Sequence, residues 1–169
     1  LARPGRNGTG VSIDSTELWP KRLEYLHQLA PKAKRITYLV NSSNPIAAKM
    51  LEEVELAART LGVRLQTLDA RNAGELGAVL QTLSKNRPEA ILVGGDALYT
   101  ANRGKVAAAV RKTRVPAMFP YDDYHQHGAL MSYGPSLREA GRLAAGYVDK
   151  ILKGAKPAEL PIQQISRFE

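Results

Sequence analysis

Short apolar runs alternate with amphipathic segments along nearly the whole chain, and this alternation limits the folds that are available. Between the runs, apolar residues recur every three or four positions, which is typical of helices that bury one face. Five runs have the length of β-strands: residues 36–40, 63–68, 90–93, 115–119 and 130–133. The run at 90–93 is apolar at every position, as expected for a central parallel strand that is covered on both faces.

The intervening segments carry residues that are typical of helix ends. Asp14 with Glu17, and Asn72 with Glu75, have the spacing of a cap and its acidic partner three residues later. Pro45 is expected at the first position of a helix whose apolar stripe starts at Ile46. Helix-ending residues follow three of the segments: Pro31, Gly62 and Gly154. A further helix is predicted over residues 100–112, a short helix or turn over 121–126, a last helix from Pro135 and an extended tail from Pro157.

Strands that alternate with helices predict an α/β fold with a mostly parallel sheet between two helical layers. Five strands joined by right-handed crossovers favour the flavodoxin-like order 2-1-3-4-5. With 169 residues the chain is expected to form a single domain, or at most one domain with a small appendage. The first residues, Leu-Ala-Arg-Pro-Gly, indicate the interior of a longer protein.

Composition and motifs exclude several classes of function. The chain has no cysteine, which excludes disulfides and thiolate chemistry. The net charge is +8, but Lys and Arg are scattered without an aromatic platform, so we do not expect nucleic-acid binding. No apolar run approaches 20 residues, so membrane insertion is not expected. A P-loop and a Gly-x-Ser-x-Gly elbow are absent from the sequence, and a non-enzymatic role without cofactors is predicted.

The loops after the first and third predicted strands are the expected binding site, because parallel sheets bind ligands where the strand order reverses. The first loop carries Ser42, Ser43 and Asn44 ahead of a helix, a combination that suits an anionic group. The second loop carries Asp96 and Tyr99, and the Asp96 carboxylate could accept from an ammonium or hydroxyl group. The alternative interpretation is that Asn44 or Ser43, and Asp96, simply cap the helices that follow.

Two further tyrosines lie at the ends of the fourth and fifth predicted strands. Tyr121 and Tyr133 could supply flat apolar contact and a hydroxyl to a ligand, or could simply pack at the rim. Near them, His125 and His127 with the adjacent acids form the sequence's one metal-like cluster. We interpret that cluster as a solvated loop and predict no metal site.

Several segments resemble one family of known proteins. Residues 1–5 and 9–12 are similar to the hinge-crossing segment of substrate-binding proteins of ABC transporters, which include tryptophan-binding TrpX-like proteins. The family's C-terminal signatures resemble residues 131–136 (Met-Ser-Tyr-Gly-Pro-Ser) and 147–157 (Tyr-Val-Asp-Lys-Ile-Leu-Lys-Gly-Ala-Lys-Pro). Lys21-Arg22-Leu23-Glu24 and Asn44-Pro45 also fit, so the resemblance spans essentially the whole chain.

The resemblance implies the C-terminal lobe of a type I periplasmic-binding fold, with residues 1–12 and 157–169 next to the hinge. Two such lobes close on a small solute, often an amino acid or related compound, and an ABC permease imports it. The N-terminal lobe is then a missing partner, and the location is periplasmic or extracytoplasmic, with a lipid anchor in a Gram-positive organism. Two alternatives stay open: a ligand-sensing module of a receptor or regulator, and a small flavodoxin-like nucleotide-binding enzyme.

Overall fold

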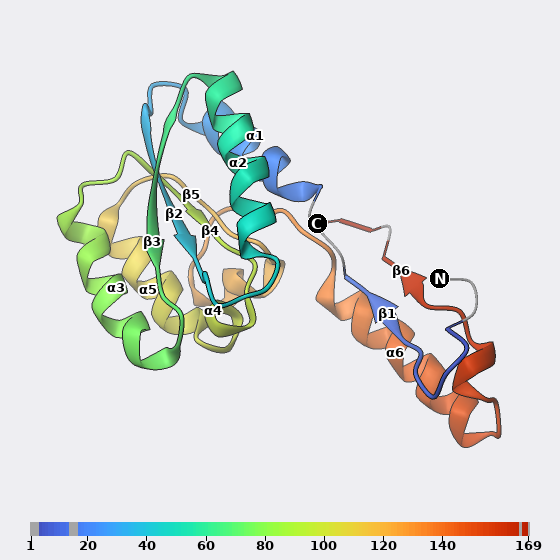
Figure 1. The fold of residues 1–169 in the computed structure, drawn as a ribbon. Coiled ribbons are helices and arrows are strands. Elements are labelled where there is room, and N and C mark those ends of the chain that lie inside the picture. Colours follow the sequence, from blue (N-terminus) through green and yellow to red (C-terminus); the bar gives the residue numbers. More distant parts are fainter. Residues whose placement is uncertain (1–3, 14–16, 166, 169) are drawn as a thin grey trace. The chain divides into compact units, whose positions relative to one another are not determined.

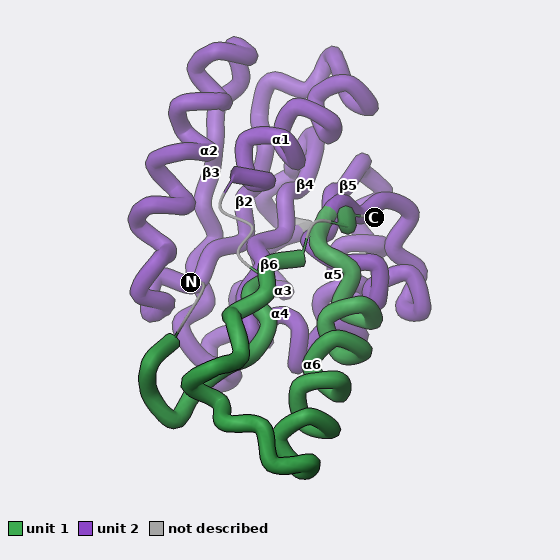
Figure 2. Tube along the Cα trace, turned by 90° about the vertical axis from the view of Figure 1, so that its right-hand side faces the viewer, with its two compact units in different colours: residues 1–15, 134–169 green, residues 16–133 purple. Residues whose placement is uncertain are grey.

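The computed structural model of this chain describes residues 4–13, 17–165, 167 and 168. The chain divides into two compact units, which Figure 2 shows in different colours. Unit 1 contains residues Leu1–Ser15 and Gly134–Glu169, and unit 2 contains Thr16–Tyr133. Both segments that were expected next to the hinge, 1–12 and 157–169, fall within unit 1.

Unit 2 is built on a parallel sheet in the order β3-β2-β4-β5. Its strands are β2 (Arg35–Val40), β3 (Arg64–Asp69), β4 (Ala90–Val93) and β5 (Ala117–Met118). β2 pairs with β3 on one side and with β4 on the other. This order matches the first four strands of the predicted order 2-1-3-4-5, so the α/β class and the reversal of strand order beside β2 are confirmed.

The predicted fifth strand is reduced to a single parallel bridge between Ser132 and Phe119. Two backbone hydrogen bonds hold it there, from the Phe119 N–H to the Met131 carbonyl and from the Tyr133 N–H to the Phe119 carbonyl, each 3.1 Å long. At the end of this ladder the Tyr133 carbonyl accepts from the Arg22 side chain. The segment therefore follows the edge of the sheet without forming a regular strand.

Helices cover both faces of the sheet (Figure 1). α1 (Leu18–Leu29) and α2 (Ala47–Leu61) lie on one face, and α3 (Ala73–Lys85) and α5 (Arg103–Thr113) lie on the other. Alternate side chains of β2 divide between the two layers, so that Ile36, Tyr38 and Val40 join the core beneath α1 and α2. All four residues of β4 are buried, which confirms its prediction as the central strand.

Several helix ends differ from the prediction. α2 begins at Ala47, two residues later than Pro45, because Asn44 makes a turn in which its side-chain oxygen accepts from the Ile46 N–H at 3.1 Å. Ile46 is therefore exposed and not part of the buried stripe. The helix predicted over 100–112 is split at Asn102 into α4 (Ala97–Ala101) and α5.

Other helix ends follow the prediction. Gly62 ends α2 in the left-handed region at φ 66°. The Asn72 side chain accepts from the N–H groups of Gly74 and Glu75 and caps α3 as predicted. The short helix predicted over 121–126 is the 3₁₀ helix η1 (Asp122–His127). The predicted cap Asp14 lies outside the described residues, and α1 begins at Leu18 directly after Glu17.

Unit 1 pairs β1 (Val11–Ser12) with β6 (Gln163–Gln164) in parallel and contains α6 (Leu137–Leu152). Ser136 caps α6, so the helix begins two residues after Pro135. In the tail that was predicted to be extended, Pro157–Glu159 forms the short 3₁₀ helix η2. No helix among the described residues is long and apolar enough to cross a bilayer.

The apolar face of α6 is mostly uncovered, although the sequence predicted that it would be buried. Tyr147 is the buried member of that face, and its hydroxyl donates to the Pro161 carbonyl. Val148 and Ile151 are exposed, and Leu152 is 83% exposed. The pair of two-residue strands in unit 1 offers too little surface to cover a 16-residue helix.

The buried central strand gives a first prediction. Leu92 is fully buried in β4, so Leu92→Ala should lower the free energy of unfolding by about 3 kcal/mol, through lost transfer energy and the cavity left behind. Leu56→Ala on α2 removes an exposed leucine and should change the free energy of unfolding by less than about 0.5 kcal/mol. Urea unfolding of both variants measures the difference, and equal effects would contradict the placement of β4.

Glu89 gives a pH-dependent prediction. Its carboxylate accepts from the N–H groups of Lys34 and Arg35 and from the Arg35 guanidinium, and these hydrogen bonds hold the pKa of Glu89 below 4.5. A carboxyl whose pKa is lowered by folding stabilises the fold above its ordinary pKa and loses that effect as the pH falls through the folded value. Glu89→Gln should therefore lower the melting temperature at pH 7, and the difference should shrink as the pH falls below about 4. A difference that is constant with pH would contradict this account.

Candidate functional site

The loops after β2 and β4 meet at the carboxyl edge of the sheet, as the strand order predicted. The Asp96 carboxylate accepts from the Asn41 side-chain amide at 2.9 Å and from the Asn44 side-chain amide at 2.7 Å. Ser43 is tied to the same network, since its hydroxyl lies 2.6 Å from the Asn41 side-chain oxygen. Three side chains of the first loop and one carboxylate of the second therefore form a single polar cluster.

Asp96 combines a capping role with a place in this cluster. One of its oxygens accepts from the Leu98 N–H at 2.8 Å and thereby caps α4. The side chain is 8% exposed, so its negative charge lies in a poorly solvated setting. An ionised carboxylate has about four acceptor positions, and Asp96 uses three of them in these hydrogen bonds.

A second carboxylate, that of Asp69 at the end of β3, was missed by the sequence analysis. It accepts from the Ser42 N–H at 2.9 Å and from the Ser42 hydroxyl at 2.5 Å. The Ser43 N–H donates to the Asn41 side-chain oxygen at 3.0 Å, and the Asn44 N–H donates to the Asn41 carbonyl at 3.1 Å. The amides that were expected to hold a ligand anion are thus already engaged by acceptors of the protein.

A small cavity of about 10 Å³ lies beneath the cluster. Asn41, Asn44 and Asp96 line it together with Tyr38, whose hydroxyl is buried and has no hydrogen-bond partner among the described residues. Burial raises the pKa of Tyr38 well above its ordinary value. The cavity has about the volume that one water molecule needs, and its lining supplies the polar partners.

Tyr99 packs beneath the loops and does not face the rim. Its side chain is fully buried, its hydroxyl donates to the Val40 carbonyl at 2.5 Å, and burial raises its pKa. The chain passes closely over it, since a Cβ on Gly94 would lie 2.5 Å from the Leu39 carbonyl oxygen. A side chain at this position would clash with the neighbouring strand, so a glycine is required there.

The two rim tyrosines lie beside α1. Tyr133 is half-buried and makes an edge-to-face contact with Tyr25 at 5.0 Å between ring centroids. Tyr121 is largely buried, and burial raises its pKa above the ordinary value while the nearby Arg22 opposes the shift. Tyr121 comes three residues after β5 and Tyr133 is the last residue of the 130–133 segment, and a ligand contact of either ring stays a prediction.

Arg22 is a second residue that the sequence analysis did not assign to the site. It is fully buried, and its guanidinium donates through Nε to the Tyr133 carbonyl at 2.5 Å and through Nη2 to the Pro120 carbonyl at 3.0 Å. The guanidinium lies over the Trp19 ring, 4.4 Å from its centroid. Burial lowers its pKa to about 10, so it remains charged at neutral pH. Its position three residues after Trp19, on the apolar face of the predicted helix, was the available signal.

His125, in the histidine cluster, makes polar contacts with residues that follow it closely in the chain. The two ring nitrogens of His125 lie 2.7 Å from the Ala129 carbonyl oxygen and 2.9 Å from the Ser132 hydroxyl oxygen. Within the described part of the chain, no group of three or more His, Cys, Asp or Glu side chains is arranged to hold a metal ion.

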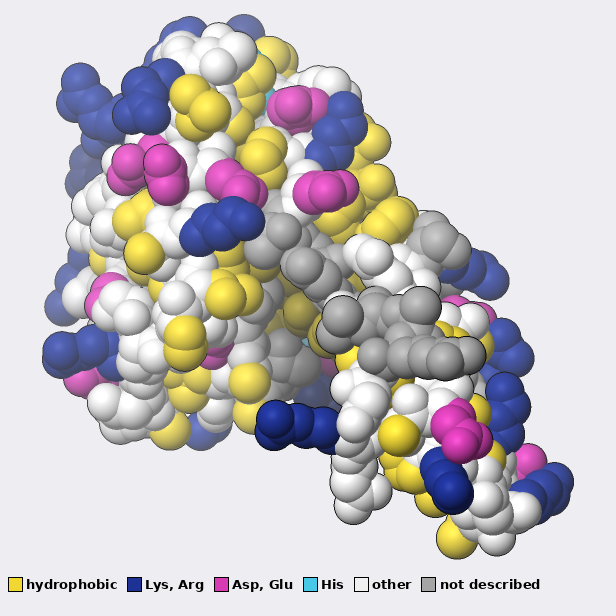
Figure 3. All heavy atoms as spheres, turned by 45° about the vertical axis from the view of Figure 1, so that its right-hand side comes forward, with side chains coloured by type: hydrophobic (Ala, Val, Ile, Leu, Met, Phe, Trp, Pro, Cys, Tyr) yellow, Lys and Arg dark blue, Asp and Glu magenta, His cyan; other side chains and the backbone are white. Residues whose placement is uncertain are grey.

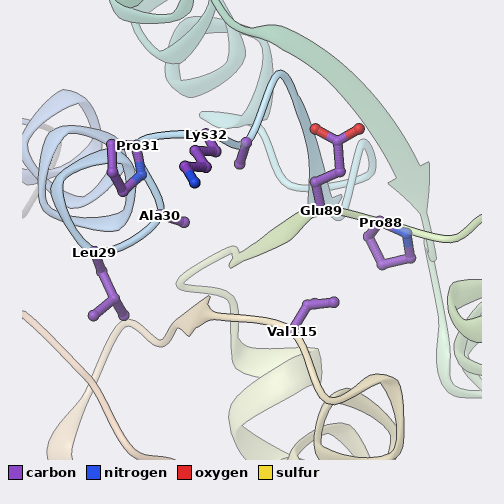
Figure 4. A pocket seen from close by; sticks show the side chains of 8 residues that line it. Leu29, Ala30, Pro31, Lys32, Pro88, Glu89 and Val115 are labelled. Carbon is purple, nitrogen blue, oxygen red and sulfur yellow. The ribbon is translucent and has the colours of Figure 1, made fainter.

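An open hollow of about 610 Å³ lies at the opposite edge of unit 2 (Figure 4). Its lining residues precede β2, β4 and β5, so they mark the amino ends of the strands. Leu29, Pro31 and Val115 give it a mostly apolar lining, while Lys32 and Glu89 contribute charges. None of the predicted site residues is among its lining residues, and parallel sheets bind ligands at the other edge.

Charged side chains are distributed over the molecular surface. On the face in Figure 3, Lys and Arg side chains stand singly or in small groups among acidic and apolar ones. Seven ion pairs of the described residues each join a basic side chain to an acidic one, as between Arg71 and Glu75 at 2.8 Å. This distribution agrees with the scattered basic residues of the sequence.

Comparisons with known proteins agree with this geometry. The chain is 21% identical over its whole length to the tyrosine-binding protein of Clostridioides difficile strain R20291, of which it covers 48%. Two solved structures match all of this chain at 24% identity. One is an ABC domain in complex with L-Trp from Streptococcus pneumoniae (TM-score 0.80, 58% of that chain covered). The other is a conserved domain protein from Vibrio cholerae (TM-score 0.82, 56% covered).

These likenesses give the fold of one lobe of a type I periplasmic-binding protein, and this chain spans about half the length of the relatives it matches. The family model for ABC transporter substrate binding proteins matches residues 1–169. The chain therefore belongs to the ABC transporter substrate-binding protein family.

Proposed function

We propose that the cluster around Asp96 forms one wall of a solute site in an extracytoplasmic binding protein that delivers its solute to an ABC permease. The observation that carries this proposal is the meeting of the β2 and β4 loops on one poorly solvated carboxylate. Membership of the substrate-binding family supports a binding role without catalysis. Unit 2 is then the C-terminal lobe, and unit 1 contains the hinge-proximal segments.

The chemistry of this wall favours a small amino-acid-like solute. Asp96 has an acceptor position left for an ammonium or hydroxyl group, and its low exposure strengthens such a contact. Tyr121 and Tyr133 supply aromatic surface at the neighbouring strand ends. The tyrosine-binding relative and the structure with bound L-Trp support an amino acid as the class. The backbone N–H groups of Ser42 and Ser43 already donate to the side chains of Asp69 and Asn41. These serines therefore hold the loop in place and contact the solute through their exposed atoms.

A second lobe is expected to supply the opposite wall. The chain spans about half of its relatives, and α6 exposes Val148, Ile151 and Leu152 on one apolar side. An uncovered stripe of that kind on a helix indicates a surface that packs against another element. Closure of two lobes on the solute excludes water and strengthens every polar contact in the site.

Identification of the natural solute tests the proposal directly. The protein purified at full length should carry a small solute that mass spectrometry detects after denaturation. After removal of this solute, the protein should be titrated in a calorimeter with L-tyrosine, L-tryptophan and a wider set of amino acids. At least one of these amino acids should show saturable binding. Absence of any amino-acid-like compound from both measurements would contradict the solute class.

Asp96→Asn gives the sharper test of the site itself. The amide keeps the size of the carboxylate and one acceptor oxygen but removes the charge that an ammonium group would pair with. Affinity for the co-purifying solute should fall at least about tenfold in calorimetry. Asp149→Asn, which replaces an exposed carboxylate on α6, is the matched control and should leave affinity unchanged. Equal affinities of the two variants would remove Asp96 from the site.

A further inference from the structure

The segment that ends in Tyr133 is weakly attached to the sheet by its own backbone. It has one bridge, at Ser132, and the two backbone hydrogen bonds to Phe119. Its first residue, Leu130, is 96% exposed and adds little packing. Beyond this bridge, the carbonyls of Pro120 and Tyr133 at the two strand ends both accept from one side chain, that of Arg22.

Arg22 joins these two strand ends through its side chain. A single guanidinium donates to both carbonyls, at 3.0 Å to Pro120 and at 2.5 Å to Tyr133. The planar fork of arginine can direct two N–H groups at separate acceptors in a fixed geometry, which a lysine ammonium on a flexible stem does not reproduce. The stacking of the guanidinium on Trp19 fixes its plane from the other side.

The cost of burying this cation indicates that its position is specifically required. No ion pair among the described residues includes Arg22, and its Nη1 atom is buried without a hydrogen-bond partner. A buried charge with neutral partners is poorly compensated, and a leucine or methionine would fit an apolar helix face at lower cost. The two carbonyl bonds are the contacts that offset this cost.

We propose that Arg22 is a positioning residue that clamps the ends of β5 and of the 130–133 segment, and thereby holds Tyr121 and Tyr133 in place as one side of the solute site. Tyr121 directly follows Pro120, and Tyr133 itself carries the second carbonyl, so each clamped peptide sets the direction of one tyrosine. Tyr133 is also the last residue of unit 2, so the clamp fixes the point at which the chain leaves this unit. The clamp stands on its own contacts, and its consequence for binding rests on the proposed function.

Hydrogen exchange of the full-length protein without solute tests the clamp. In Arg22→Met, amide exchange at Phe119 and Tyr133 should become about tenfold faster or more, because the strand ends open once the charged hydrogen bonds are lost. Arg22→Lys keeps the charge and most of the volume, maintains the fold should the methionine variant fail, and should show the same local acceleration. Exchange in β2 and β4 should stay at the wild-type rate in both variants.

Lys21→Met is the matched control, because it removes a positive charge from the neighbouring position of α1 whose partner is Glu24. It should leave exchange at Phe119 and Tyr133 within about twofold of wild type. Unchanged exchange in both Arg22 variants, or acceleration spread equally over β2 and β4, would overturn the clamp. A solute titration of the same variants then separates the clamp from its effect on binding. Faster local exchange with unchanged affinity overturns the positioning role and leaves the clamp as a purely structural contact.

Discussion

The hydrogen bonds between the Asp96 carboxylate and the side-chain amides of Asn41 and Asn44 are the interaction on which the proposed site depends. They exist because β2 pairs with β3 on one side and with β4 on the other, so the loops after β2 and β4 leave the same edge as neighbours. The loop conformations follow from these bonds: Asn44 delays the start of α2, and Asp96 starts α4. A poorly solvated carboxylate with one acceptor position left is the result.

Most of the fold could be predicted from the sequence, because the spacing of apolar residues and the residue types at helix ends are local signals. The all-apolar β4, the Asn72 cap and the Gly62 stop were each readable from a few neighbouring residues. The errors lie at a side-chain turn and at surfaces that the periodicity alone does not show. The turn at Asn44 displaced the start of α2, the predicted fifth strand is reduced to a single bridge at Ser132, and α6 exposes a face whose periodicity predicted burial.

The site likewise contains residues that the sequence predicted and residues that it missed. The strand order placed Ser43, Asn44 and Asp96 together, since that inference needs only the topology. Asp69 and Arg22 were missed because their partners lie 27 and 111 positions away in the chain. The fully buried position of Tyr99 likewise depends on an acceptor 59 residues away, the Val40 carbonyl. Residues of the site that are recruited by distant backbone groups cannot be recognised from local patterns alone.

Two edges of unit 2 could receive a ligand, and their chemistry differs. The amino edge offers the broad open hollow around Leu29 and Val115, whereas the carboxyl edge offers converging polar groups over a cavity of about 10 Å³. A binding protein of two lobes needs half of a site on each lobe, and half a site is shallow when seen alone. The small cavity beneath the Asp96 cluster is therefore compatible with a cleft that closes against a second lobe.

A crystal structure of the full-length protein with its co-purified solute would test this account most directly. We expect the solute at the carboxyl edge of unit 2, within hydrogen-bond distance of the Asp96 carboxylate or the Asn44 amide and in contact with the Tyr121 or Tyr133 ring. A solute seated instead in the hollow beside Leu29, Pro31 and Val115 would contradict it.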